Sequence, residues 1–326
     1  MGRLKDLPIS SLGLGGTALG NMFRATDDAT AEATVDAAWD AGIRLFDTAP
    51  LYGHGLSEQR LGRALAHRPR DEFVLSTKVG RLLEPGAGEE TTFVDLPDLH
   101  PVFDYSAAAT RRSFEESLER LGLDRVDVLL VHDPDDHEDD ARTGAFPELI
   151  RMRDEGMISA IGTGMNQAEM PARFLAELDI DCLLLAGRYT LLEQRGRGVL
   201  LDTCADRNVD VMIGGVFNSG LLVDPHRADV TYEYWPAAPQ FVERAQQIEA
   251  VCRRYGVSLA TAALQFPLAH PAVVAVLTGA RSPEEIRENA SLAARPVPSE
   301  LWSALAAEGL LDRDAPVPGA SSPNLG

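Results

Sequence analysis

Residues 43–48 read IRLFDT, residues 73–78 read FVLSTK, and residues 126–132 read VDVLLVH. Each run is short and mostly apolar, and each ends in a polar side chain. A strand that is buried on both faces has this pattern, whereas a strand with one solvated face alternates between apolar and polar residues. The three runs therefore predict parallel strands that are covered on both sides.

The same kind of run recurs along the chain and alternates with segments of helical period. Further strands are predicted at residues 11–15, 158–164, 181–185, 209–215 and 273–278. Helices are predicted between them at residues 28–41, 57–66, 106–121, 141–155, 167–177, 194–207, 259–269 and 283–294. Two additional helices are predicted at residues 240–255 and 299–308. Eight β–α units in order predict an α/β protein, a closed (β/α)8 TIM barrel with extra helices after its seventh strand and at its C-terminus.

The predicted barrel forms a single domain over residues 1–311, and residues 312–326 are expected to be an irregular C-terminal tail. Residues 80–105 are the longest stretch with neither a helical nor a strand period. A loop of that length is typical of a lid or a binding loop. We expect the substrate pocket to be formed by this loop and by residues 133–140 and 217–237.

Composition excludes several classes of partner. The 326 residues contain 30 Lys and Arg against 50 Asp and Glu, a net charge of −20, which disfavours nucleic acid and anionic membrane surfaces. No apolar run is long enough to span a membrane. The three cysteines are far apart and predict no disulfide framework, which fits a reducing, cytoplasmic location; they are Cys182, Cys204 and Cys252.

Two motifs suggest functions that their contexts disfavour. Residues 13–18 (GLGGTA) match the dinucleotide-binding pattern, with Glu32 or Asp36 downstream, but the next helix signal comes only at residues 26–28. Because that fingerprint must open a helix directly, a glycine-rich turn at the mouth of the first barrel strand is favoured. Residues 132–140 (HDPDDHEDD) resemble a metal site, but Pro134 breaks any helical register. A solvated loop without a metal is therefore expected.

Cys204 and Cys252 are expected to be buried on helices.

Three ionisable residues end consecutive predicted strands, namely Asp47, Lys78 and His132, and Tyr52 follows Asp47 in the next loop. The C-terminal ends of barrel strands converge on one mouth, where catalysis occurs. An ammonium such as Lys78 lowers the pKa of a neighbouring phenol, and Asp47 would hold that ammonium in place. His132 would orient a carbonyl or carbinol oxygen. This set suits proton transfer at oxygen coupled to hydride transfer at carbon, which requires a nicotinamide or flavin cofactor.

The motif at residues 47–53 (DTAPLYG), with Ser57-Glu58, Leu61-Gly62, STK at 76–78 and LVH at 130–132, strongly resembles the aldo-keto reductase superfamily. Residues 132–135 (HDPD), 162–167 (GTGMNQ) and 186–192 (AGRYTLL) resemble its branch of aldose and pyridoxal dehydrogenases. The resemblance implies a catalytic tetrad of Asp47, Tyr52, Lys78 and His132, with Tyr52 as general acid and base. It also implies an extended nicotinamide dinucleotide across the C-terminal mouth, near Gly16, Thr17, Asp47, Asn166, Phe217, Asn218, Ser219, Gly220, Leu221, Gly279, Ala280, Arg281, Glu288 and Asn289.

Three positions depart from the family pattern. The Ser-Asn pair that holds the carboxamide aligns with Gly164-Met165, which leaves Asn166 as the candidate for that role. The stacking Tyr aligns with Gly214, three positions before Phe217. The basic residues that bind the 2′-phosphate of NADP align with Gly279 and Glu285. A carboxylate there favours NAD over NADP, although Arg281 is a residue that could still bind NADP.

The leading hypothesis is an NAD(P)-dependent oxidoreductase that acts on a small-molecule aldose or aldehyde. The expected reaction is the oxidation of an aldose hemiacetal, of the L-fucose or D-threo-aldose type, to a lactone. Alternatives are pyridoxal 4-dehydrogenase and a general aldehyde or ketone reductase. A cofactor-binding regulatory subunit is the non-enzymatic alternative, and a metal-dependent barrel hydrolase that uses residues 132–140 is a third class.

Overall fold

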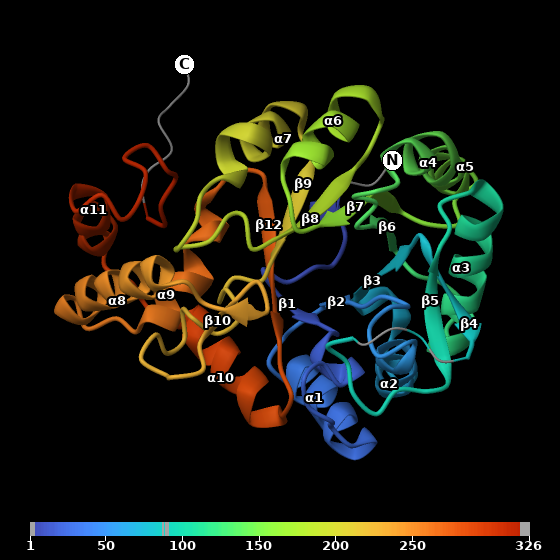
Figure 1. Cartoon of the computed structure of the whole chain (residues 1–326), viewed down its shortest axis with the longest axis horizontal. Coiled ribbons are helices and arrows are strands. Elements are labelled where there is room, and N and C mark those ends of the chain that lie inside the picture. Colours follow the sequence, from blue (N-terminus) through green and yellow to red (C-terminus); the bar gives the residue numbers. More distant parts are fainter. Residues whose placement is uncertain (1–3, 87, 89–90, 320–326) are drawn as a thin grey trace.

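A computed structural model describes residues 4–86, 88 and 91–319 (Figure 1). Eight parallel strands close into a barrel in the spatial order β1-β12-β9-β8-β7-β6-β3-β2. The strands are β1 (Leu12–Gly15), β2 (Leu45–Asp47), β3 (Val74–Val79), β6 (Val128–His132), β7 (Ala160–Met165), β8 (Cys182–Ala186), β9 (Asp210–Gly214) and β12 (Val273–Gly279). The predicted (β/α)8 barrel is therefore confirmed.

Helices surround the barrel on its outside (Figure 1). The main ones are α1 (Asp28–Asp40), α2 (Leu56–Leu65), α3 (Ala107–Leu121), α4 (Glu138–Asp140), α5 (Phe146–Asp154), α6 (Glu169–Glu177), α7 (Asp202–Arg207), α9 (Leu259–Gln265) and α10 (Pro283–Ala294). The two predicted extra helices are present as α8 (Pro239–Arg254) and α11 (Ser299–Ala307). Short 3-10 turns are η1 (Leu4–Asp6), η2 (Ala18–Gly20), η3 (Arg70–Glu72) and η6 (Pro267–Ala269).

Several helices begin at a side-chain cap. Asp27, Ser106 and Ser282 each accept a hydrogen bond from the backbone N–H three residues later. Such a cap satisfies one of the N–H groups that a helix leaves unpaired at its start. The helices predicted at residues 141–155 and 194–207 are α-helical only in part, because η4 (Ala141–Ala145) and η5 (Arg197–Leu201) are π-helical turns.

The apolar side chains of the strands form two layers of core. One layer fills the barrel and includes Leu45, Val128 and Met212, with Leu4 closing it from the N-terminal turn. The other lies between the strands and the helices and includes Phe46, Leu129 and Ile213. Consecutive residues of one strand thus enter different layers, which explains why the strands are not amphipathic. Cys182, Cys204 and Cys252 are buried and unpaired, as expected.

The prediction for residues 80–105 is wrong in part. This stretch contains an antiparallel hairpin of β4 (Arg81–Pro85) and β5 (Leu99–Phe103), in which Arg81 pairs with Phe103. The hairpin lies beside α3 (Figure 1). Pro85 and Pro101 interrupt both strand patterns, and Pro is unfavourable within a sheet except at an edge. A second small hairpin is formed by β10 (Thr231–Tyr232) and β11 (Trp235–Pro236).

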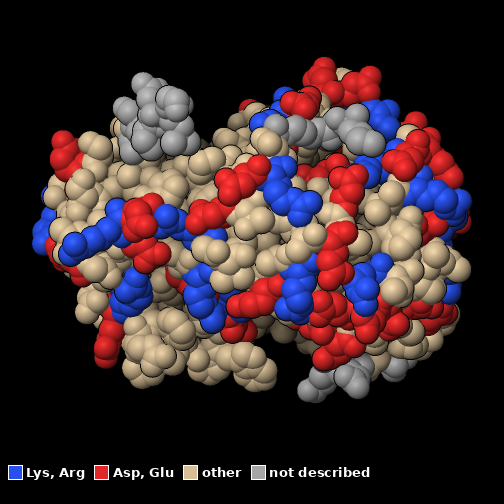
Figure 2. Space-filling view, turned by 90° about the horizontal axis from the view of Figure 1, so that it is seen from above, with Lys and Arg blue, Asp and Glu red and all other residues tan. Residues whose placement is uncertain are grey.

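The C-terminal tail is described only to residue 319. Ala315 packs against the outer core, and its N–H donates to the carbonyl of Asp312 over 3.1 Å. Of the predicted irregular tail at residues 312–326, residues 320–326 lie outside the described residues. On the face shown in Figure 2, Lys and Arg side chains are interspersed with Asp and Glu and form no continuous basic patch among the described residues. No helix in the described part of the chain is both long and apolar enough to cross a membrane.

Candidate active site

A buried ion pair joins the ends of β2 and β3. The Lys78 Nζ lies 2.7 Å from Asp47 Oδ2 and donates a second hydrogen bond of 2.9 Å to the Thr48 carbonyl. The side chains of Lys78 and Asp47 are only 1% and 4% exposed. Gly164 on β7 makes room for the lysine, because a Cβ there would lie 3.2 Å from Lys78 Cε. The barrel therefore fixes the ammonium between two strands with little freedom to move.

Tyr52 lies over this ion pair. Lys78 Nζ donates to the Tyr52 hydroxyl oxygen over 3.0 Å. The tyrosine loop is held by a close approach of two backbones, since a Cβ on Gly20 would lie 2.5 Å from the Tyr52 carbonyl carbon. Gly53 adopts a φ of +65°, which favours glycine. The phenol ring faces Phe93 and the imidazole of His132, with ring centroids 6.2 and 5.8 Å away. The structure thus brings the four predicted catalytic residues together.

Burial dominates the electrostatics of the site. It raises the pKa of Tyr52 to about 12, although the Lys78 ammonium acts in the opposite direction. Burial alone would lower the pKa of Lys78, but Asp47 and the tyrosine oxygen raise it on balance. Burial, with the charges of Arg81 and Lys78, lowers the pKa of His132 well below its usual value. At neutral pH the phenol is protonated and the imidazole neutral. Lys78 lowers the pKa of Tyr52, as expected, but the opposite effect of burial is larger.

His132 ends β6, and the backbone after it is strained. Asp133 has a φ of +38°, and the Tyr105 hydroxyl donates to the carbonyl of His132 over 2.7 Å. Asp133 Oδ2 lies 3.5 Å from His132 Nε2 and 3.2 Å from Arg81 Nη2. Burial raises the pKa of the Asp133 carboxyl to about 6, although Arg81 opposes the shift. Asp133 belongs to the HDPD motif and to the expected pocket segment 133–140, but its sequence context predicts no role of its own, and no sequence signal points to Arg81 or Tyr105.

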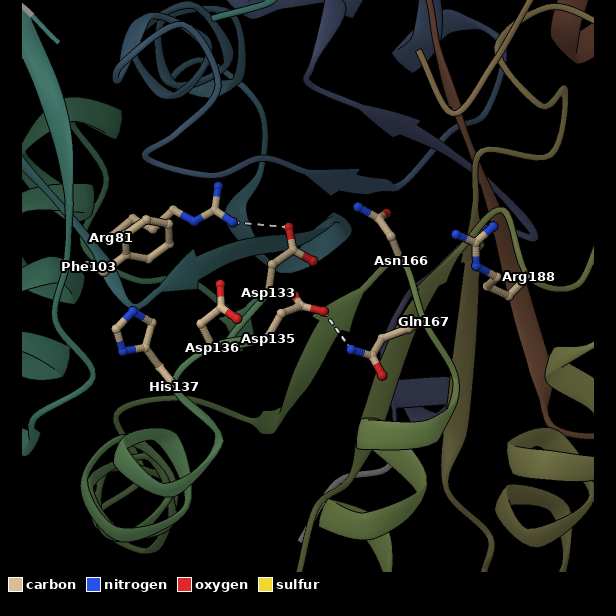
Figure 3. A pocket seen from close by; sticks show the side chains of 9 residues that line it. All are labelled: Arg81, Phe103, Asp133, Asp135, Asp136, His137, Asn166, Gln167 and Arg188. Atoms are coloured by element: carbon tan, nitrogen blue, oxygen red, sulfur yellow. Dashed lines mark hydrogen bonds and ion pairs between the residues drawn. The ribbon is translucent and has the colours of Figure 1, made fainter. Parts of the chain in front are cut away.

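A cavity of about 510 Å³ opens beside these residues, and mainly polar side chains line it (Figure 3). Arg81 and Asp133 face it from one side and Asn166 and Arg188 from the other (Figure 3). The His137 ring stacks on Phe103 with centroids 5.3 Å apart, so it does not converge with His132. Within the described residues, no group of three or more His, Cys, Asp or Glu side chains is arranged to hold a metal ion. The run at residues 132–140 instead supplies part of the cavity wall.

The predicted cofactor residues lie at the same end of the barrel as the tetrad. Gly16 and Thr17 follow β1, and Gly279 and Ala280 end or follow the adjacent strand β12. Asn166 follows β7, residues 217–221 follow β9, and Glu288 and Asn289 lie on α10. Asn289 Nδ2 is 3.5 Å from the carbonyl of Gly279. The positions therefore form an arc along one rim.

The loop after β9 is the part of this arc with an unused polar group. Asn218 is 5% exposed, and its Oδ1 has no hydrogen-bond partner among the described residues. Asn218, Ser219 and Gly220 have consecutive positive φ values of 46°, 59° and 92°. The unpartnered amide oxygen of Asn218 could accept a hydrogen bond from an extended polar ligand such as a dinucleotide. The Leu221 side chain is buried and its N–H donates to the Asn218 carbonyl, and its expected contact with the cofactor stays a prediction.

The start of α10 carries the groups that bear on cofactor choice. Glu285 Oε2 accepts from the Arg281 backbone N–H over 2.8 Å, which keeps a carboxylate at the helix N-terminus. The Arg281 guanidinium donates to the Met22 carbonyl over 2.7 Å. Arg281 is therefore engaged across the rim with the loop after β1. Only the backbone N–H of Arg281 contacts Glu285, whereas its guanidinium points to Met22.

An eight-stranded α/β barrel with an Asp-Tyr-Lys-His set at its C-terminal mouth defines a class of nicotinamide-dependent oxidoreductases. A family model described as the aldo/keto reductase family matches residues 11–308, and the chain belongs to that family. It is 44% identical over 315 residues to D-threo-aldose 1-dehydrogenase from Pseudomonas sp, covering 94% of this chain and 95% of the relative. It is 39% identical over 329 residues to pyridoxal 4-dehydrogenase from Microbacterium luteolum, with the same coverages of 94% and 95%.

A solved structure shares the fold. The glycerol dehydrogenase of Gluconobacter oxydans superposes with a TM-score of 0.75 at 26% identity, covering 98% of this chain and 95% of that one. The predicted membership in the aldo-keto reductases is confirmed, and the protein is an NAD(P)-dependent oxidoreductase. The competing Rossmann and metal-hydrolase interpretations are thereby set aside.

Proposed function

We propose that the protein oxidises C1 of an aldose hemiacetal to the lactone, with NAD as the electron acceptor. The observation that carries this proposal is that Asp133, 3.5 Å from His132 of the tetrad, lines a cavity whose wall carries carboxylate, amide and guanidinium groups. Such groups bind sugar hydroxyls through directional hydrogen bonds. The 44% identity to D-threo-aldose 1-dehydrogenase supports the same substrate class.

The chain's own residues would handle the proton and orient the substrate. When bound, the oxidised nicotinamide would accept the hydride that leaves C1. Tyr52 would first lose its own proton to solvent, and the resulting phenolate would take the proton of the C1 hydroxyl, so that one C–H and one O–H bond of the substrate break and the C=O bond forms. The Lys78 ammonium, 3.0 Å from the phenol oxygen, would stabilise the phenolate that forms transiently. Asp47 would hold the ammonium there, and neutral His132 would donate a hydrogen bond to the reacting oxygen.

The pKa of about 12 for Tyr52 affects whether the enzyme favours oxidation or reduction at a given pH. A protonated phenol is ready to donate in carbonyl reduction, whereas oxidation needs the phenolate. The oxidative rate should therefore rise with pH, while the reductive rate should not.

The cofactor proposed is NAD, held by the residues after β1, β9 and β12 and on α10. The Glu285 carboxylate at the start of α10 supports this choice, because it would repel the dianionic 2′-phosphate of NADP.

Pyridoxal oxidation is the second candidate. The stacked rings of Phe103 and His137 line the cavity and offer a platform for an aromatic ring. The 39% identity to pyridoxal 4-dehydrogenase agrees with this observation. The regulatory-subunit alternative is disfavoured, because a complete proton-transfer set is present.

A substrate panel with each cofactor tests these proposals. L-fucose, other aldoses, pyridoxal and simple aldehydes are each assayed with NAD and NADP at the absorbance of the reduced nicotinamide. We expect the highest kcat/KM with an aldose and NAD. A preference for pyridoxal would select the second candidate, and activity with simple aldehydes alone would contradict both.

A further inference from the structure

Asp133 is energetically unfavourable in its position, and proton transfer by Asp47, Tyr52, Lys78 and His132 does not require it. Its side chain is 19% exposed, and its backbone adopts a φ of +38°. A carboxylate in such a place loses hydration, and a non-glycine residue with positive φ is strained. The backbone is held by hydrogen bonds from the Tyr105 hydroxyl and to the Gly164 carbonyl. Hydrogen bonds to Tyr105 and to β7 thus support one conformation of this residue.

The position of the carboxylate relative to His132 suggests what it binds. Asp133 Oδ2 lies 3.5 Å from Nε2 of His132, the residue proposed to donate to the reacting oxygen. A substrate oxygen held by Nε2 therefore has the carboxylate as its neighbour. In a cyclic aldose, the C1 oxygen is flanked by the ring oxygen and by the hydroxyl on C2. A carboxylate only accepts hydrogen bonds, so it can pair with the C2 hydroxyl but not with the ring oxygen.

Arg81 fixes the orientation of the carboxylate. Its Nη2 donates to Asp133 Oδ2 over 3.2 Å, and its guanidinium lies 5.1 Å from the centre of the Phe103 ring. Arg81 and Phe103 are paired residues of the β4–β5 hairpin, and both line the cavity (Figure 3). The hairpin therefore places a guanidinium behind the carboxylate, and the Asn166 backbone also hydrogen-bonds to it, while the carboxylate itself lines the cavity.

We propose that Asp133, oriented by Arg81, accepts a hydrogen bond from the C2 hydroxyl of the substrate and selects 2-hydroxylated aldoses over 2-deoxy sugars and simple aldehydes. This inference rests on the proposed aldose dehydrogenase activity. It assigns to Asp133 a role in specificity, next to the catalytic histidine but separate from proton transfer.

The test compares L-fucose with 2-deoxy-L-fucose. A hydrogen bond to a charged group corresponds to a preference of roughly 10- to 100-fold in kcat/KM. Wild-type protein should show that preference. Asp133→Ala should lower kcat/KM for L-fucose by about the same factor, change the value for the deoxy sugar less than about threefold, and bring the ratio near one. Asp133→Asn, whose amide oxygen still accepts, should give an intermediate ratio.

Asp139→Asn is the matched control. It removes one negative charge from the same acidic run, at an exposed residue paired with Arg142, and should keep the wild-type ratio. Dissociation constants for NAD, measured by fluorescence quenching, report whether each variant retains its fold. If Asp133→Ala does not fold, Asp133→Asn carries the comparison, since Asn tolerates the left-handed conformation.

Two results would overturn the inference, and they are distinguishable. An unchanged preference in the Asp133 variants, even with lower activity on both sugars, would make Asp133 a structural residue and leave the proposed function intact. A wild-type protein that oxidises no aldose would remove the proposed function, and this inference with it.

Discussion

Replacing Lys78 by Met tests whether the site depends on a buried ion pair. The substitution keeps the apolar stem but removes the ammonium 2.7 Å from Asp47, whose carboxylate is then buried without its counter-charge. Removing one partner of such a pair costs about 3–5 kcal/mol. With an unfolding entropy of about 2.1 cal/mol/K per residue, 326 residues give about 0.7 kcal/mol per kelvin, so Tm should fall by about 4–7 °C.

The double variant Asp47→Asn/Lys78→Met separates stability from catalysis. Because neither charge remains, most of the lost Tm should return, whereas activity should stay reduced by about 10²-fold or more because Tyr52 lacks its ammonium. Burial raises the pKa of Asp47, so the folded single variant can protonate this carboxyl as pH falls. Its Tm deficit should therefore be largest at pH 7–8 and shrink toward pH 5.

Differential scanning calorimetry and steady-state kinetics provide the two readouts. A Lys78→Met protein whose Tm stays within about 1 °C of wild type would refute the buried-pair argument, since the expected loss is several times larger. Recovery of activity in the double variant would refute the role of the ammonium in proton transfer.

Three further predictions concern the same site. Tyr52→Phe should lower turnover by about 10²–10⁴-fold while NAD affinity, measured by fluorescence, stays within twofold; retention of most activity would contradict the proton-transfer role. In the wild type, oxidation should accelerate from pH 7 to pH 9, because the pKa of Tyr52 is raised to about 12 and phenolate grows with pH, while reduction should stay flat; a falling oxidative rate would exclude this assignment. Glu285→Gln should improve NADP affinity by roughly 3- to 10-fold through lost charge repulsion, with NAD affinity unchanged as the internal control.

The barrel could be predicted because the apolar composition of its strands indicates that both faces are buried. Runs such as residues 43–48 and 126–132 are apolar on both faces and end in a polar residue, and the barrel gathers those ends at one mouth. The site followed from the same logic, with Asp47, Lys78 and His132 on neighbouring strands.

The remaining features depend on contacts between distant segments. The β4–β5 hairpin was missed because its strands contain prolines and pair only with each other. The Arg81–Asp133 pair joins residues 52 positions apart, which no local pattern indicates. The pKa of Tyr52 rises because burial outweighs the effect of Lys78, and the depth of burial cannot be read from residue types alone. The burial of the Leu221 side chain in the core likewise depends on packing that its local sequence does not indicate.

The β4–β5 hairpin hydrogen-bonds as a separate two-stranded sheet and leaves the pairing of the barrel strands untouched. It is inserted between β3, which carries Lys78, and α3. Its length and sequence could therefore be exchanged without shifting the register that sets the reactive groups. If the proposed roles hold, the barrel strands carry the reacting groups, and the hairpin can change in sequence to alter substrate choice without disturbing them.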